Sequence, residues 1–152
     1  MGIELFERIA EARGRILRVE QLVAAGAAPD PSHGPGYLLT FDVGRILVAA
    51  DRVHGRLLLR PVAAPAELEG IARAPLDEEE PWWRVAGNPL VRAWPVESGA
   101  GAASGAGDVR ELRLQFRDDD ASPKLISLRY EGGAVWVAEE KTEQRRRQGA
   151  PR

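Results

Sequence analysis

The sequence contains no cysteine, two histidines, and only two lysines (Lys124 and Lys141) among its 21 basic residues. Without cysteine the chain can form no disulfide, no thiolate metal site and no cysteine nucleophile. No run approaches the roughly 18 consecutive apolar residues that a membrane-spanning helix needs. Charged residues also interrupt the amino-terminal segment where a signal peptide would need an apolar stretch. We therefore expect a cytoplasmic protein with no membrane partner.

The composition is that of one soluble globular domain. The chain has 152 residues, of which 44% are hydrophobic and 29% are charged, and this length can bury a single sizeable core. A formal net charge of −2 provides no overall attraction to nucleic acid or to an anionic membrane. The excess of arginine accompanies abundant alanine, glycine and proline, which favours a GC-rich genome as its cause over selection for phosphate binding.

The second half of the chain resembles the first half. Gly14, Phe41 and Gly55 correspond to Gly87, Phe116 and Gly133 at a nearly constant separation, with similar strand-like runs around each. This spacing predicts an internal duplication of residues 14–64 and 87–140 within a single globular domain spanning residues 1–140. Residues 141–152 have no large apolar side chain, and we predict a disordered tail there.

The pattern of apolar residues predicts an α+β fold that is mainly antiparallel β. Leu112, Leu114 and Phe116 alternate with polar residues, which indicates strands with one buried face and one wet face. We expect about eight strands in two similar four-stranded meanders, arranged as a sandwich, a curved sheet or a barrel. The expected strands lie at 16–23, 37–42, 45–50, 56–62, 90–96, 110–117, 125–131 and 134–139.

The remaining segments are predicted to be helices and loops. Apolar residues at helical spacing predict an N-terminal helix over residues 3–12. Two short connector helices are expected, one starting at Pro65 and one from Pro81 to Ala86, because proline is tolerated in a first helical turn. Residues 24–36 are expected to form an exposed loop, and the Gly/Ala/Ser-rich stretch 98–107 a mobile one.

A cluster of tryptophan and arginine lies where the two halves join. Trp82, Trp83, Arg84 and Arg92 fall in this segment, and exposed indole and guanidinium groups commonly dominate protein interfaces. Adjacent residues on a helix point in directions about 100° apart, so Trp82 and Trp83 cannot be equally buried. Two interpretations remain open, a core anchor and a binding surface. We prefer Trp82 and Arg84 as contacts with a partner protein.

The sequence contains no recognisable catalytic or metal-binding spacing. His33 and His54 each lack a second metal ligand at a suitable separation, and no serine lies in a Gly-x-Ser-x-Gly motif. The acidic run Asp77–Glu80 suits the start of a helix, and Asp118–Asp120 suits a turn. We expect no enzyme, no metal and no cofactor. The alternative is an enzyme whose site is assembled only in three dimensions around His54 and Asp118.

The carboxy-terminal arginines do not change the expected partners. The positive charge of Arg145–Arg147 is offset by nearby Glu139, Glu140 and Glu143, so nucleic acid is not an expected partner. Another protein is the expected one, and the oligomeric state is left open.

The segment Trp-x3-Gly-Asn-Pro-Leu-x3-Trp, from Trp83 to Trp94, precedes the strand Leu112–Phe116 and an aliphatic hairpin. Over residues 83–137 this arrangement resembles small bacterial domains of unknown function, some of which are similar to immunity proteins of toxin systems. The resemblance implies protein binding without catalysis, and it assigns no functional residue.

Overall fold

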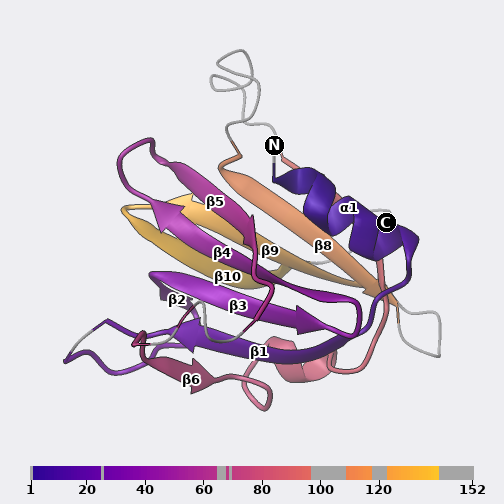
Figure 1. Cartoon of the computed structure of the whole chain (residues 1–152), viewed down its shortest axis with the longest axis horizontal. Coiled ribbons are helices and arrows are strands. Elements are labelled where there is room, and N and C mark those ends of the chain that lie inside the picture. Colours follow the sequence, from indigo (N-terminus) through magenta and orange to yellow (C-terminus); the bar gives the residue numbers. More distant parts are fainter. Residues whose placement is uncertain are drawn as a thin grey trace, which may run out of the picture.

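The computed structural model describes residues 2–24, 26–64, 68, 70–96, 109–117 and 123–140. Within these residues the strands form two five-stranded antiparallel sheets that share one hydrophobic core and do not close into a barrel (Figure 1). The first sheet has the order β5-β4-β3-β1-β6, with β1 at Ile16–Leu22, β3 at Gly36–Phe41, β4 at Gly44–Asp51, β5 at Arg56–Pro61 and β6 at Arg73–Pro75. The second sheet has the order β2-β10-β9-β8-β7, with β2 at His33–Gly34, β7 at Leu90–Pro95, β8 at Glu111–Arg117, β9 at Pro123–Glu131 and β10 at Ala134–Glu140. The mainly antiparallel fold expected from the alternation is therefore confirmed.

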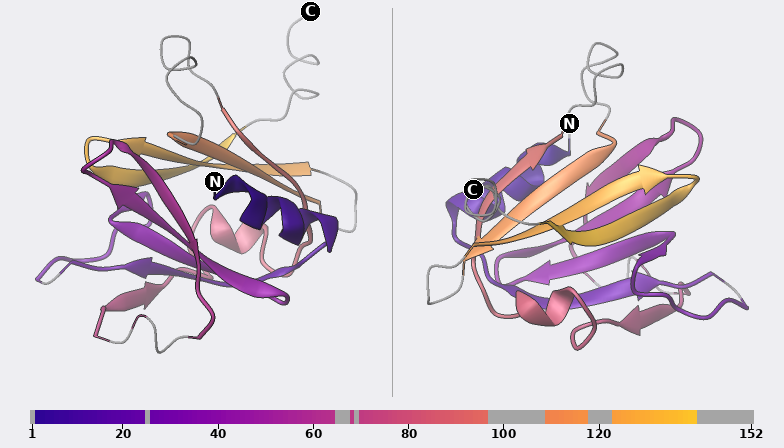
Figure 2. Two further views of the ribbon diagram at one scale, coloured as in Figure 1. Left: turned by 45° about the horizontal axis from the view of Figure 1, so that its top comes forward. Right: turned by 180° about the vertical axis from the view of Figure 1, so that it is seen from behind.

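Helix α1 (Ile3–Glu11) lies between the two sheets at one side of the molecule (Figure 2). It packs mostly on β7 and also reaches β4 and β5. Phe6, Ile9 and Ala10 are its buried residues, as the helical spacing of apolar residues requires. The Phe6 ring meets the Phe41 ring edge-on at 6.4 Å, which ties the helix to the core of the first sheet.

The two halves of the chain contain equivalent four-stranded meanders. β1, β3, β4 and β5 are hydrogen-bonded in chain order, and so are β7, β8, β9 and β10. The first strand of each meander has a register shift at the same place, between Ile16 and Arg18 in β1 and between Leu90 and Arg92 in β7. The residue that precedes each shift pairs with a buried phenylalanine, Phe41 or Phe116. The shared strand order and the shared bulge are what an internal duplication predicts.

The starts of the two halves also pair with each other. An isolated antiparallel bridge joins Arg15 to Pro89. Beside this bridge the Leu90 N–H donates to the Gly14 carbonyl at 2.8 Å, and the Ile16 N–H donates to the Asn88 carbonyl at 3.2 Å. A two-fold rotation that exchanges the halves would exchange these two hydrogen bonds. The bridge therefore lies at the centre of the pseudosymmetry and brings residues 13–15 beside residues 87–92.

Several elements differ from those predicted. β2 and β6 add one short strand to an edge of each sheet, and neither was expected, because two or three residues are too few to show alternation. The helix expected from Pro81 to Ala86 is only a single 3-10 turn, η2 (Trp82–Arg84). The loop 98–107, the tail 141–152, Asp118–Asp120 and most of the helix expected from Pro65 lie outside the described residues.

Candidate functional site

The two adjacent tryptophans have opposite environments. Trp82 is only 1% exposed and belongs to the main core, with its ring tilted against that of Tyr37 at 6.4 Å. Trp83, the next residue, is 49% exposed. The prediction that Trp82 and Trp83 are not equally buried is thus confirmed. Trp82 as a preferred contact is wrong, because a side chain enclosed by the core cannot touch a partner.

The exposed Trp83 indole is held in place by its neighbours. Its Nε1 donates to Glu80 Oε2 at 3.1 Å, and the Arg84 guanidinium lies over the ring at 4.8 Å. Arg84 also donates to Glu80 Oε2 at 3.1 Å. It forms a second ion pair, at 3.3 Å, with Oε1 of Glu139, which lies on β10. The indole N–H and then the Arg84 guanidinium stabilise the Glu80 carboxylate, so the pKa of Glu80 is lowered.

Glutamates outnumber arginines in the segment that carries this indole. Glu78 and Glu79 are exposed and directly precede Glu80 in the chain. Asp77 has another role, since its Oδ1 accepts the Val19 N–H at 2.8 Å and so connects the segment to β1. We call the following residues the Trp83 surface: Glu78, Glu79, Glu80, Trp83, Arg84 and Glu139. This surface can offer an aromatic face and several negative charges to a ligand.

Arg92 contributes to a different surface. It lies on β7 with its guanidinium over the Trp94 ring at 4.5 Å. It also lines a groove of about 600 Å³ together with Arg13, Arg15 and Arg117. The structure therefore brings Trp83 and Arg84 together as expected, whereas Arg92 belongs with arginines that the sequence did not single out. We call this second feature the arginine groove.

His54 lies in the turn between β4 and β5, where its environment is that of a turn residue. Its Nδ1 lies 2.9 Å from Asp51 Oδ2, and its side chain is 60% exposed. Asp51 also accepts the His54 backbone N–H and the Arg56 Nε, so these contacts, led by the His54 side chain, lower its pKa. His54 lines neither the arginine groove nor the smaller pocket described below. Asp118, the other residue of the enzyme alternative, lies outside the described residues.

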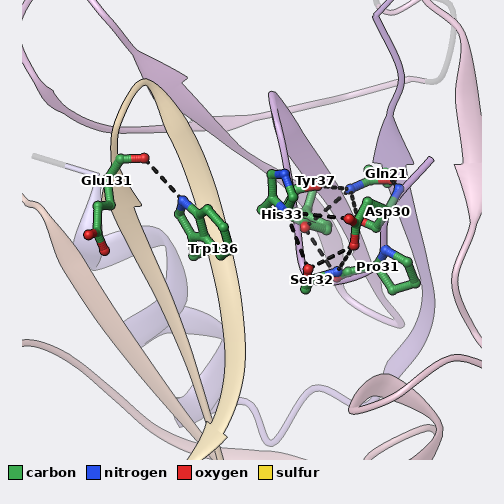
Figure 3. Close-up of polar contacts among 8 residues, drawn as sticks. All are labelled: Gln21, Asp30, Pro31, Ser32, His33, Tyr37, Glu131 and Trp136. Atoms are coloured by element: carbon green, nitrogen blue, oxygen red, sulfur yellow. Dashed lines mark hydrogen bonds and ion pairs between the residues drawn. The ribbon is translucent and has the colours of Figure 1, made fainter. Parts of the chain in front are cut away.

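His33 belongs to a polar network that sequence reasoning missed (Figure 3). The buried Gln21 amide donates to the carbonyls of Asp30 and His33 and to the Tyr37 hydroxyl, which fixes the loop 30–33 against the first sheet. The His33 ring stacks on Trp136 of β10 at 4.2 Å. The loop therefore contacts both sheets, and its residues His33–Gly34 pair with β10 as the short strand β2. Burial raises the pKa of the Tyr37 hydroxyl, so Tyr37 stays neutral and structural.

The same loop contains a serine, a histidine and an aspartate in contact, in an arrangement typical of a turn. The Ser32 hydroxyl donates to Asp30 Oδ1 at 2.7 Å, and the Ser32 backbone N–H donates to the same oxygen. These bonds lower the pKa of Asp30, the hydroxyl bond most. The Asp30 carboxylate can only accept, so the Ser32 hydroxyl donates to it, while His33 Nδ1 lies 3.2 Å from the same hydroxyl oxygen. A pocket of about 270 Å³ lies beside this loop, lined mainly by alanine, proline and glycine.

Among the residues that the structure describes, no three histidines or carboxylates gather as a metal site would require. Within the same residues no helix combines the length and the apolar character that crossing a membrane demands. Comparison of the chain with protein-family models, with curated proteins and with solved structures found no match.

Proposed function

We propose that this is a non-catalytic binding protein that recognises another protein through the Trp83 surface. The observation that carries the proposal is the half-exposed Trp83 indole, held between Glu80 and Arg84 next to a fully buried Trp82. A large aromatic side chain that is already ordered loses little conformational freedom on binding, and such residues are typical interface hot spots.

The backbone beneath the indole supports this role. The Trp83 N–H donates to the Glu79 carbonyl at 3.1 Å, and the Val85 N–H donates to the Trp82 carbonyl at 3.0 Å. With Trp82 and Val85 both in the core, η2 is fixed on its inner side. The outward position of Trp83 therefore follows from packing and not from a mobile loop.

The charge of the surface indicates the kind of partner. Arg84 is already paired with Glu80 and Glu139, and the exposed Glu78 and Glu79 directly precede Glu80 in the chain, so the surface carries more carboxylates than guanidiniums. A partner segment bearing arginine or lysine could place a cation over the indole or between the carboxylates. We therefore infer a partner with a basic segment.

The test compares two tryptophan variants in capture experiments and in titrations of the purified partner. Trp83→Ala/Arg84→Ala should lose the partner that the wild-type protein retains. Trp136→Ala is the matched control, since Trp136 is 36% exposed on a different part of the molecule and should keep the partner. Glu78→Gln/Glu79→Gln should weaken binding at low salt. A folded Trp83→Ala/Arg84→Ala protein that retains every partner would show that the proposal is wrong.

A further inference from the structure

The arginine groove is lined by four guanidinium groups that come from distant parts of the chain. Arg13 and Arg15 lie between α1 and β1, Arg92 follows the bulge of β7, and Arg117 ends β8. The bridge between Arg15 and Pro89 holds these segments side by side. Pro89 and Val91 add an apolar part to the lining.

None of these four arginines forms an ion pair with a carboxylate of the described residues, and what distinguishes them from other unpaired arginines such as Arg18 is that they line one groove. Arg56, Arg84, Arg113 and Arg129 each form an ion pair with an aspartate or a glutamate. In the described part of the chain, no such pair involves an arginine of the groove. Arg15 donates to the Gly87 carbonyl at 2.9 Å, and Arg13 lies 3.5 Å from the Val91 carbonyl. The nearby Asp42 carboxylate accepts the backbone N–H of Arg15 and not its guanidinium.

Each guanidinium carries five N–H donors, so most donors in the groove have no acceptor among the residues that the structure describes. Four positive charges that line one groove, none of them paired with a described carboxylate, repel one another. An anion with several oxygens would satisfy both the charges and the donors, because guanidinium binds phosphate and carboxylate through paired hydrogen bonds.

The backbone at Arg13 is a second, independent observation. Arg13 has a φ of 54° and ends α1 in a Schellman motif, in which its N–H donates to the Ala10 carbonyl and the Gly14 N–H to the Ile9 carbonyl. This left-handed position usually holds glycine, because a Cβ is unfavourable there. The chain has arginine at this position, and the Arg13 side chain lines the groove. Strain of this kind is common where a side chain is used for binding.

We propose that the arginine groove binds a small molecule bearing a diphosphate. A volume of about 600 Å³ falls within the range of small-molecule sites. Four guanidiniums match the charge of a diphosphate better than that of a single phosphate, and the apolar lining at Pro89 and Val91 suits an uncharged part of the same molecule. The arginine groove shares no residue with the Trp83 surface, through which we propose that the protein recognises its partner.

The experiment is a calorimetric titration of the full chain with inorganic pyrophosphate at low ionic strength, beside phosphate and citrate. Pyrophosphate should bind with a stoichiometry of one and at least about tenfold more tightly than phosphate or citrate. Arg92→Gln and Arg13→Gly should each weaken binding about tenfold. Arg13→Gly should also keep or raise the melting temperature, because glycine accepts the left-handed backbone, so weaker binding cannot be attributed to unfolding.

Arg18→Gln is the matched control. Arg18 follows the bulge of β1 just as Arg92 follows the bulge of β7, and it does not line the groove. This variant should bind pyrophosphate within about twofold of the wild type. The proposal is overturned if pyrophosphate does not bind at millimolar concentration, if Arg18→Gln weakens binding as much as Arg92→Gln, or if phosphate or citrate binds as tightly as pyrophosphate.

Discussion

Replacing Trp82 by alanine should destabilise the protein far more than the same change at Trp83. Trp82 is 1% exposed and packs in the main core, so its removal leaves a cavity that the surrounding sheets cannot fill. Such truncations of a buried tryptophan cost about 3–5 kcal/mol. Trp83 is half-exposed, and its loss should cost less than about 1 kcal/mol. For a domain of this size the Trp82 variant should melt roughly 6–20 °C below the wild type.

The assay is urea unfolding followed by far-ultraviolet circular dichroism, since removing a tryptophan changes the fluorescence signal. Trp82→Phe adds a useful intermediate. The buried Nε1 of Trp82 has no hydrogen-bond partner in the described structure, so phenylalanine removes an unsatisfied donor while keeping most of the packing. The Trp82→Phe change should lower the free energy of unfolding by less than half as much as Trp82→Ala does. Equal losses for Trp82→Ala and Trp83→Ala would refute the assignment of Trp82 to the core.

Three further predictions follow from the packing and the charges. Phe41→Ala and Phe116→Ala should each cost about 3–5 kcal/mol in urea unfolding, because both rings are buried at equivalent positions; a change below 1 kcal/mol at either would contradict this. Arg13→Gly should raise the free energy of unfolding by about 1 kcal/mol, whereas a fall would show that the Arg13 side chain stabilises the fold. The pKa of Asp51 is lowered in the folded state by His54, so its contribution to stability is present above its unfolded pKa of about 3.9 and is lost as the pH falls through the folded pKa. Asp51→Asn should therefore flatten the loss of stability in acid, and an unchanged acid profile would contradict that linkage.

The sheets could be predicted from the sequence because their strands are long enough to alternate. Leu112, Leu114 and Phe116 place one face of β8 in the core, and the structure buries all three. Short edge strands carry no such signal, so the sequence predicts a loop at the residues that form β2. The hydrogen bonds that hold it come from Gln21, whose role depends on contacts across the fold.

The candidate site was only partly predictable, for a related reason. Sequence reasoning could show that Trp82 and Trp83 point in different directions, but the choice of the buried one depends on which side of η2 faces the sheets. The sequence shows that Gly14 and Gly87 occupy similar positions in the two halves, but it does not show that the two segments pair through the Arg15–Pro89 bridge. Without that pairing, Arg13 and Arg15 could not be associated with Arg92.

Hydrogen–deuterium exchange, measured with and without the captured partner, tests the proposed recognition most directly. The account predicts slower exchange at 78–86, which includes Trp83, and at the end of β10 that carries Glu139. Exchange in the turn at 51–56 should be unchanged. Protection confined to that turn, with none at 78–86, would contradict the account and would direct attention to His54 instead.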